Sequence, residues 1–381
     1  MYMNSIVLIF TLYIIYLFFE SYQNKKYRKK IKHIVHVNGT RGKSSTCRLI
    51  EASLRGGDFK VFCKTTGTSP RTIDTNGVEK QIIRKGRANI KEQLRIIKEA
   101  AIQDTDVLVI ECMAVNPDLQ YISQHKILRA DISIVTNVRR DHLEEMGPSL
   151  KDIAISLGKV MPFNGVFITA EESFIDYYRE LGKKQNSKVV LAEDLDDDYG
   201  IDFKENVSIA LEVCKVLGVD KDIAIERMKN YRKDPGSLKV YQIKNDNKVD
   251  IRFINGLAIN DPDSISIIYE RFTKDGLFRN KDLIILVNNR ADRPDRMKQH
   301  VELIKQLDFN QIWITGEFKN VMKRKLISDG MDRSFIKKID ILDDSILKQI
   351  QNETVIFAIG NIVGHGEQII NYIENTGDTI V

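Results

Sequence analysis

The chain shows two series of short apolar runs, separated by segments in which apolar residues recur at helical spacing. The first series comprises residues 61–63, 106–112, 131–137 and 166–169, and the second comprises residues 251–259, 283–287, 312–315 and 355–359. Short buried strands that alternate with helices are typical of mostly parallel sheets covered on both faces. Proline and glycine break a helical pattern in DPGSLK, residues 234–239. The pattern therefore predicts two α/β domains, at residues 31–236 and 237–381, the second being the smaller.

An almost wholly apolar stretch precedes these domains. No charged residue occurs before Glu20, and residues 6–19 are nearly all hydrophobic. About 20 apolar residues cross a bilayer, so the stretch is just long enough to span one. It has neither the basic start nor the small-residue cleavage site of a signal peptide. A buried N-terminal helix is the alternative. We expect residues 1–30 to form a single membrane anchor with a basic flank.

A block of basic residues follows the apolar stretch: Lys25, Lys26, Arg28, Lys29, Lys30 and Lys32. Basic residues beside a span mark its cytoplasmic side, so we expect a single-pass protein of the cell membrane with both α/β domains in the cytoplasm. The block supplies part of the net charge of +5, so nucleic-acid binding is not expected. The four cysteines are far apart and indicate neither a disulfide framework nor a zinc site.

The stretch HVNGTRGKSS, residues 36–45, departs from the common phosphate-loop pattern. That pattern requires a glycine five residues before Gly42, where this chain has Val37. A β-branched run precedes the stretch, and a helical pattern follows it. Strand, glycine turn and helix form the setting in which backbone N–H groups bind phosphate, with Lys43 as a cation and Ser44 as a Mg²⁺ ligand. An ordinary turn with a solvated lysine is the alternative.

Polar side chains follow two of the predicted strands. Glu111 ends the apolar run that starts at Val107, and TNVRRDHLEEMG presents Asp141 and His142 after the next run. Ligands of open α/β sheets collect at the carboxyl ends of strands. Mg²⁺ prefers oxygen ligands, so we expect Ser44 and Glu111 to bind it and His142 to help hold a second ion. The alternatives are that Glu111 is a surface residue that caps the end of the strand, and that His142 is a hydrogen-bonded polar residue without a metal.

Four segments together resemble motifs of the Mur ligase superfamily: NGTRGKSS, TNVRRDHLEEMG, NVSIALEVCKVLG from Asn206, and AINDPDS from Ala258. The resemblance implies a phosphate-loop central domain with a mostly parallel sheet and a smaller Rossmann-like C-terminal domain. It also implies an ATP site, made by Asn38, Gly39, Thr40, Arg41, Gly42, Lys43, Ser44, Ser45, Asn206 and Asp261. The carbamylated lysine common in that superfamily is not assigned here.

A narrower resemblance is to the ligase subunit of poly-γ-glutamate synthases, the PgsB/CapB family. KTTGTSPR, ECMAVNPDLQ, DHLEEMGPSL, NNRADRPDR and IGNIVGHGE are similar to segments of that subunit in the same order. The family implies an ATP- and Mg²⁺-dependent amide ligase that forms an acyl phosphate and ADP, with Lys43, Glu111 and His142 as catalytic residues. It also implies glutamate and the growing polymer as substrates, and multi-span and accessory membrane subunits as partners. Homo-oligomerisation stays open.

Glutamate polymerisation also requires cations that bind carboxylates. Arg290, Arg293 and Arg296 follow a predicted strand, and Arg71 follows GTSP. Arginine binds carboxylates through two parallel hydrogen bonds, so we expect Arg71, Arg290 and Arg293 to contact substrate. Pairing with the interleaved Asp292 and Asp295 is the alternative. Two other functions stay open: a ligase similar to folylpolyglutamate synthase, and a non-catalytic membrane scaffold that binds nucleotide.

Overall fold

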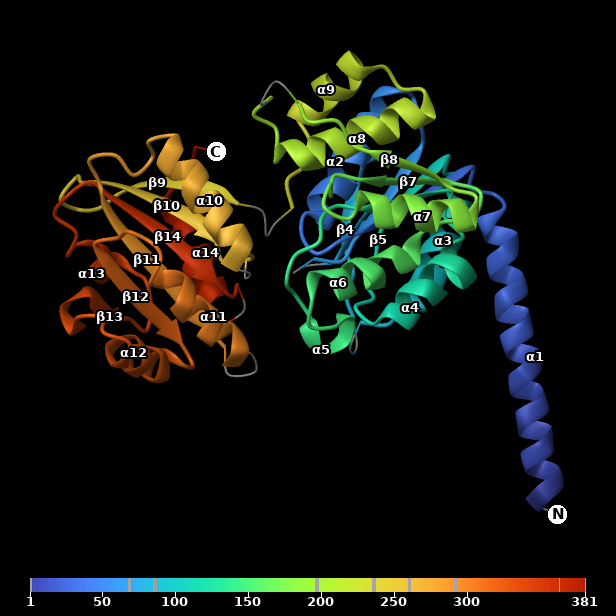
Figure 1. Ribbon diagram of the computed structural model, residues 1–381, viewed down its shortest axis with the longest axis horizontal. Helices are drawn as coiled ribbons and strands as arrows, with labels where there is room; N and C mark the ends of the chain where they lie inside the picture. The colour runs from blue at the N-terminus through green and yellow to red at the C-terminus, as the bar shows by residue number, and fades with distance from the viewer. Residues whose placement is uncertain are drawn as a thin grey trace. The chain divides into compact units, whose positions relative to one another are not determined.

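The computed structural model describes residues 2–67, 70–84, 86, 88–195, 199–234, 238–259, 262–290, 294–362 and 364–380. The chain divides into two compact units, unit 1 (Met1–Asp234) and unit 2 (Pro235–Val381) (Figure 1). The boundary expected between residues 236 and 237 falls outside the described residues.

Unit 1 is built on a sheet of eight strands in the order β4-β3-β2-β5-β1-β6-β7-β8. The strands are β1 (His33–Asn38), β2 (Val61–Thr65), β3 (Arg71–Ile73), β4 (Glu79–Gln81), β5 (Val107–Glu111), β6 (Ile132–Val135), β7 (Val166–Thr169) and β8 (Lys188–Leu191). The strands from β2 to β8 in this order are parallel, whereas β3 and β4 form an antiparallel hairpin at the edge next to β2. The expected mostly parallel sheet is confirmed.

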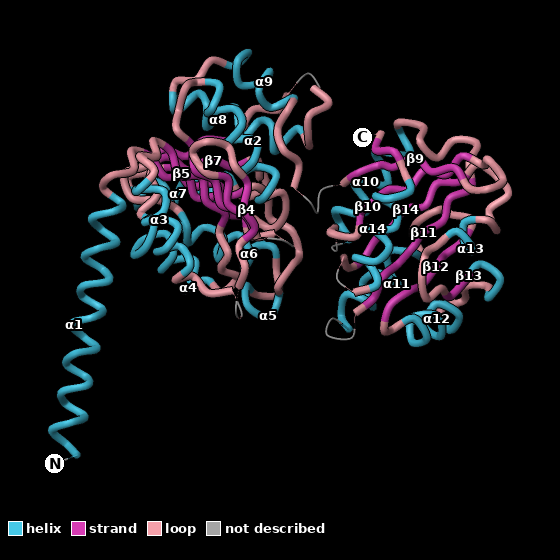
Figure 2. Tube along the Cα trace, turned by 180° about the vertical axis from the view of Figure 1, so that it is seen from behind, coloured by secondary structure: helices cyan, strands magenta, loops and turns pink. Residues whose placement is uncertain are grey.

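Helices cover both faces of this sheet (Figure 2). They are α2 (Lys43–Gly56), α3 (Glu92–Ile102), α4 (Pro117–Ile122), α5 (Leu143–Met146), α6 (Leu150–Leu157), α7 (Ile175–Gln185), α8 (Lys204–Leu217) and α9 (Lys221–Lys229), with short helical turns η1 (Ser123–Leu128) and η2 (Gly158–Val160). Successive residues of β1 point to opposite faces. Val35 and Val37 pack with α2, α8 and α9, whereas Ile34 packs with α3 and η1.

His36 is a fully buried imidazole on the α3 side of β1. Its Nδ1 lies 2.9 Å from Gln124 Oε1, and no hydrogen-bond partner of Nε2 occurs among the described residues. Burial lowers the pKa of His36 to about 4; the bond to Gln124 opposes this, and nearby Lys64 and His125 add to it. His36 is therefore neutral at physiological pH.

This shift predicts a pH dependence of stability. Because the pKa of His36 is lower in the folded chain, the unfolded chain takes up a proton first as the pH falls below about 6.5. We expect His36 to lower the free energy of unfolding by about 2 kcal/mol when the pH falls from 7.5 to 5. In His36→Gln the side-chain amide can still donate to Gln124 but does not titrate. Chemical denaturation at both pH values should therefore show that the free energy of unfolding falls by about 2 kcal/mol less in the variant than in the parent chain. An unchanged drop would contradict the assignment.

The remaining helix of unit 1, α1 (Tyr2–Arg28), is long and apolar enough to cross a membrane, and its apolar window is not buried by the rest of the structure. Its last turns, in contrast, contact unit 1. Asn24 Nδ2 donates to Ile127 O at 2.9 Å, and Arg28 donates to the carbonyls of Leu128 and Arg129 and to Asp131 Oδ2 at 2.7 Å. α1 therefore joins unit 1 as one continuous helix.

Unit 2 contains a second sheet, of seven strands in the order β13-β12-β11-β14-β10-β9-β15. The strands are β9 (Lys239–Lys244), β10 (Asp250–Gly256), β11 (Asp282–Asn289), β12 (Gln311–Gly316), β13 (Ile336–Lys338), β14 (Thr354–Gly360) and β15 (Asp378–Thr379), with helices α10 (Pro262–Lys274), α11 (Pro294–Ile304), α12 (Lys319–Ser328), α13 (Asp344–Leu347) and α14 (His365–Thr376), and a short turn η3 (Arg333–Phe335). The strands from β13 to β10 are parallel, β9 is antiparallel to β10, and β15 is antiparallel to β9. This agrees with the second α/β domain expected from the sequence.

Candidate active site

The glycines of the stretch between β1 and α2 fit a tight turn. Gly39 has φ 129° and Gly42 has φ 78°, both in the region that favours glycine. A Cβ at Gly39 would lie 2.0 Å from Thr136 Oγ1, and one at Gly42 would lie 2.6 Å from Asn206 Oδ1. Gly42 precedes α2 without a side-chain cap, so the first N–H groups of α2 are free to bind an anion.

Lys43 curls back over this loop. Its Nζ donates to Gly39 O at 2.7 Å and to Thr40 O at 3.1 Å. These two bonds hold the ammonium beside the turn and close to the start of α2. A positive charge at a helix N-terminus adds to the attraction of the backbone N–H groups for phosphate oxygens.

The loop is also fixed from the end of β6, which pairs with β1. Thr40 N donates to Asn137 O at 3.1 Å and Arg41 N to Asn137 Oδ1 at 3.0 Å. Thr136 Oγ1 donates to Arg41 O at 2.5 Å, and Arg41 Nη2 lies 3.0 Å from Asp141 Oδ2. TNVRRDH therefore shapes the phosphate loop, a role that sequence reasoning did not assign to Thr136 and Asn137.

Ser44 and Glu111 lie together, as the sequence predicted. Ser44 Oγ donates to Glu111 Oε2 at 2.8 Å, and the same oxygen accepts a 2.6 Å bond from Thr66 N. Glu111 is 3% exposed and ends β5, which neighbours β1 in the sheet. A carboxylate and a hydroxyl beside a phosphate loop fit Mg²⁺, which uses few protein oxygens together with phosphate oxygens and water.

His142 lies outside any dense cluster of metal ligands. Its φ is 49°, its side chain is 28% exposed, and its nitrogens lie 3.8 Å from carboxylate oxygens of Asp141 and Glu145. Across the described ranges, no three or more His, Cys, Asp or Glu side chains gather closely enough to hold a metal ion. The expected role of His142 at a second ion stays a prediction.

Asn206 abuts the phosphate loop from α8. It is 5% exposed, its Oδ1 accepts a 3.2 Å bond from Thr46 Oγ1, and its Nδ2 donates to Asp202 Oδ1 at 2.8 Å. This side chain therefore joins α8 to α2 directly behind Gly42. A contact with the adenine of ATP stays a prediction, and Asp261, the other expected ATP residue, lies outside the described residues.

A buried arginine on α2 was missed by sequence reasoning. Arg48 is 1% exposed, its Nη2 lies 2.5 Å from Glu79 Oε1, and its Nε lies 3.5 Å from Asp234 Oδ2. Arg71, expected to contact substrate, has its Nε 3.8 Å from the same Glu79 oxygen. Arg48 therefore ties α2 to the β3–β4 hairpin that carries Arg71 and to the residue that ends unit 1.

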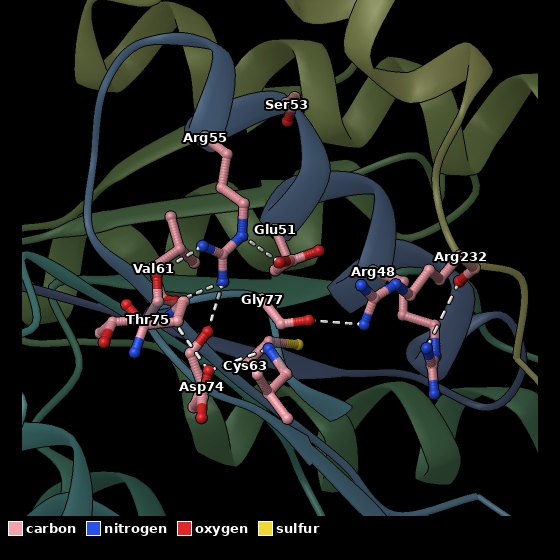
Figure 3. Close-up of polar contacts among 12 residues, drawn as sticks. Arg48, Glu51, Ser53, Arg55, Val61, Cys63, Asp74, Thr75, Gly77 and Arg232 are labelled. Carbon is pink, nitrogen blue, oxygen red and sulfur yellow. Dashed lines mark hydrogen bonds and ion pairs between the residues drawn. The ribbon is translucent and has the colours of Figure 1, made fainter. Parts of the chain in front are cut away.

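Arg55 adds a second tie from α2, as Figure 3 shows. It donates to the carbonyls of Val61, Asp74 and Thr75, at 2.8, 2.6 and 2.8 Å. Arg48 and Arg55 are seven residues apart and so share one face of α2. This spacing is the one sequence feature that could have indicated the contacts of these two arginines, but solvent-exposed helix faces commonly show the same spacing.

Lys64, in KTTGTSPR, is a buried cation at the end of β2. Its Nζ lies 3.0 Å from Glu92 Oε1, and Glu92 also accepts two bonds from Arg84. Burial lowers the pKa of Lys64, and Glu92 and Glu111 oppose this. Burial raises the pKa of Glu92, but Arg84 and Lys64 together outweigh it and lower that pKa to about 2. Glu92 is therefore ionised at physiological pH and pairs with both Lys64 and Arg84.

The arginines expected to contact substrate in unit 2 are placed only in part. Arg290 follows β11 directly, and Arg296 lies in the first turn of α11. Arg293 lies outside the described residues. Their role in binding carboxylates stays a prediction.

The two parts of the chain match two family models. Residues 37–226 match the Mur ligase middle domain, and residues 240–376 match the poly-gamma-glutamate synthase CapB C-terminal domain. The chain is 33% identical to the capsule biosynthesis protein CapB of Bacillus anthracis, over 88% of this chain and 75% of that protein. It is also 33% identical to PGA synthase CapB of Bacillus subtilis (strain 168), over 88% of this chain and 89% of that protein.

Solved structures show the same fold at much lower identity. Folylpolyglutamate synthase of Mycobacterium tuberculosis, complexed with ADP and AMPPCP, has a TM-score of 0.68 at 12% identity, covering 91% of this chain and 92% of that one. FolC of Escherichia coli in complex with ADP has a TM-score of 0.66 at 14% identity, covering 93% of this chain and 92% of that one. MurF of Acinetobacter baumannii has a TM-score of 0.65 at 15% identity, covering 93% of this chain and 79% of that one. With the two family models and the two CapB relatives, the chain belongs to the CapB family of poly-γ-glutamate synthases, within the Mur ligase fold.

Proposed function

We propose that this chain is an ATP-dependent, ADP-forming amide ligase that lengthens poly-γ-glutamate by adding glutamate through γ-linked peptide bonds. The single observation that carries the proposal is the geometry at the carboxyl edge of the first sheet, where Lys43 and the start of α2 flank the phosphate loop and Ser44 contacts Glu111. Family membership supplies the polymer, since the relatives are named for capsule biosynthesis and PGA synthesis.

The residues present fit two-step acyl transfer. The loop N–H groups and Lys43 hold the β- and γ-phosphate oxygens. A carboxylate oxygen of the acceptor then attacks the γ-phosphorus, the bond between that phosphorus and the bridging oxygen breaks, and ADP leaves. The amine nitrogen of the second substrate attacks the acyl carbon, the bond from carbon to the phosphate oxygen breaks, and the nitrogen loses a proton to solvent. The protein positions groups and offsets charge that spreads over the transferred phosphoryl oxygens.

Ser44 and Glu111 would hold Mg²⁺ in this scheme. The ion supplies positive charge beside the phosphate oxygens when it is bound. Thr66 N–H, which donates to Glu111, keeps one carboxylate oxygen turned toward Ser44. The Glu111 carboxylate is therefore held in place by Thr66 and Ser44.

Glu111→Gln should weaken metal-dependent turnover more than nucleotide binding. The amide keeps the shape and one acceptor oxygen, but it loses the charge that balances Mg²⁺, while the loop N–H groups stay unchanged. We expect turnover to fall roughly 100-fold and to recover in part at high Mg²⁺. Turnover over a Mg²⁺ titration, alongside ATP affinity, checks this, with the exposed Glu205→Gln on α8 as control. Normal turnover at ordinary Mg²⁺ would make Glu111 a structural residue.

The function is tested with membranes that contain the full chain, ATP, Mg²⁺ and labelled D- or L-glutamate. We expect ADP release that depends on glutamate, and a labelled product of high molecular mass; the two labels decide which enantiomer is used. ADP release that depends on a pterin substrate would favour the folylpolyglutamate synthase alternative. ATP binding without ADP release would favour the non-catalytic scaffold.

The cellular setting is part of the proposal. α1 would anchor the chain in the cell membrane by a single span, with both units in the cytoplasm, because the basic block follows the span. Multi-span and accessory membrane subunits would be its partners, because a polymer of glutamate is polyanionic and one helix cannot line a pore for it.

A further inference from the structure

The buried Arg48 lies close to the expected Mg²⁺ ligand Ser44. The two residues are four positions apart in α2, so their side chains share one face of the helix. Asp234 connects them: its Oδ2 lies 3.5 Å from Arg48 Nε. A Cβ built on Gly67 would lie 3.0 Å from Ser44 Oγ and 3.6 Å from Asp234 Oδ1. Arg48 therefore belongs to the surroundings of the phosphate loop.

The β3–β4 hairpin presents Arg71 and Glu79 on the face of the sheet that α2 covers. Ile73 of β3 packs in the same core cluster as apolar residues of α2. Arg71 is two residues before Ile73 in β3, and Glu79 pairs with Ile73 across the hairpin, so all three side chains point to this face. Arg48, Arg71 and Glu79 therefore meet between α2 and the hairpin.

The carboxylate of Glu79 is shared unequally between the two arginines. Its Oε1 lies 2.5 Å from Arg48 Nη2 but 3.8 Å from Arg71 Nε. The side chain of Arg48 is 1% exposed, whereas that of Arg71 is 29% exposed. A short ion pair in a buried position is stronger than a longer one near solvent. Glu79 is therefore held mainly by Arg48.

The guanidinium of Arg71 keeps its donors. Within the described ranges, Arg71 Nε is buried and has no hydrogen-bond partner, and the 3.8 Å contact with Glu79 is its one ion pair. Thr65, which pairs with Arg71 between β2 and β3, has a buried Oγ1 that also lacks a hydrogen-bond partner among the described residues. A guanidinium with unused donors beside a hydroxyl is suited to bind a carboxylate.

We propose that Arg48 is a positioning residue for the acceptor substrate: by holding Glu79, it leaves Arg71 available to bind an α-carboxylate of the growing polymer. The proposal rests on the function proposed above, which makes this polymer the acceptor. γ-Linkage uses the side-chain carboxyl groups, so every residue of the acceptor keeps an α-carboxylate. Without Arg48, the carboxylate of Glu79 would turn to Arg71, which is already within 3.8 Å, and would compete with the substrate.

The test measures binding of a fluorescent γ-linked glutamate oligomer to the full chain in detergent, together with ADP release and thermal unfolding. Arg71→Gln removes the proposed contact. Arg48→Met removes the residue that holds Glu79, and Arg48→Met with Glu79→Gln removes the competing carboxylate as well. Arg55→Met is the matched control, because Arg55 also ties α2 to the hairpin but does so through backbone carbonyls of the hairpin turn.

We expect Arg48→Met to weaken oligomer binding about tenfold, and Arg71→Gln to weaken it at least as much. In turnover, the KM for the oligomer should rise by the same factor while the KM for ATP stays that of the parent chain. The double variant, Arg48→Met with Glu79→Gln, should regain most of the lost affinity. Arg55→Met should bind the oligomer as the parent chain does.

Unchanged binding by Arg71→Gln overturns the inference, as does a double variant as weak as Arg48→Met, or an equal loss in Arg55→Met. If Arg48→Met does not fold, Glu79→Gln alone decides: binding as tight as that of the parent chain or tighter supports the inference, and weaker binding overturns it. A parent chain that binds no oligomer also overturns it, whatever its ADP release. Oligomer binding without glutamate-dependent ADP release would contradict the proposed function and leave the role of Arg48 standing.

Discussion

Lys43→Ala is expected to abolish ATP-dependent polymer synthesis while unit 1 stays folded. The ammonium lies over the phosphate loop, and its hydrogen bonds within the described part of the chain go to the carbonyls of Gly39 and Thr40, so the packing of the core does not depend on it. Its loss removes the positive charge that stabilises the developing negative charge on the transferred phosphoryl group. Removal of one such preorganised donor costs about 100- to 1000-fold in rate, which would bring synthesis below detection.

The measurement is incorporation of labelled glutamate by membranes with matched amounts of each variant, alongside thermal unfolding. Lys221→Ala is the control, because Lys221 is an exposed lysine at the start of another helix of unit 1, α9. We expect the control to match the parent chain in both assays. A well-folded Lys43→Ala chain that makes polymer at the parent rate would remove this loop from the active site.

The phosphate loop shows what local sequence can predict. The order of Gly39, Gly42, Lys43 and Ser44 after a β-branched strand predicted a strand, a glycine turn and a helix, and the structure has them in that order. The sequence did not show why the first glycine of the loop, Gly39, comes later than in the common pattern. The reason lies in the close approach of Thr136, which directly follows β6, almost a hundred residues further on. Contacts of that kind depend on which strands become neighbours.

The parts that sequence reasoning missed share this non-local origin. The apolar runs predicted most of the buried parallel strands, but β3 and β4 have only three residues each, and no such run marks them. Arg48 is buried only because Glu79 and Asp234, from distant segments, meet it there. A buried arginine cannot be told from a solvated one until its partners are known.

Deletion of residues 1–20 is the second prediction with a large expected effect. The cut removes the exposed apolar part of α1 but retains Asn24 and Arg28, whose side chains bond to residues 127–131 of unit 1. We therefore expect a soluble, folded protein with nearly unchanged ATP affinity. Deletion of residues 1–31 is the comparison, because it also removes these bonds and the buried Ile31, and should lower the free energy of unfolding by about 4 kcal/mol.

The shorter deletion should nevertheless leave little extracellular polymer. Charged groups are expensive inside a bilayer, and one short span cannot line a pore for a polyanion, so export requires a membrane partner. Separation from that partner, rather than damage to the ATP site, would cause the loss. Extracellular polymer, nucleotide affinity and unfolding are measured together for both deletions. Full polymer secretion by the chain lacking residues 1–20 would show that the anchor is dispensable, and would favour a soluble ligase similar to folylpolyglutamate synthase.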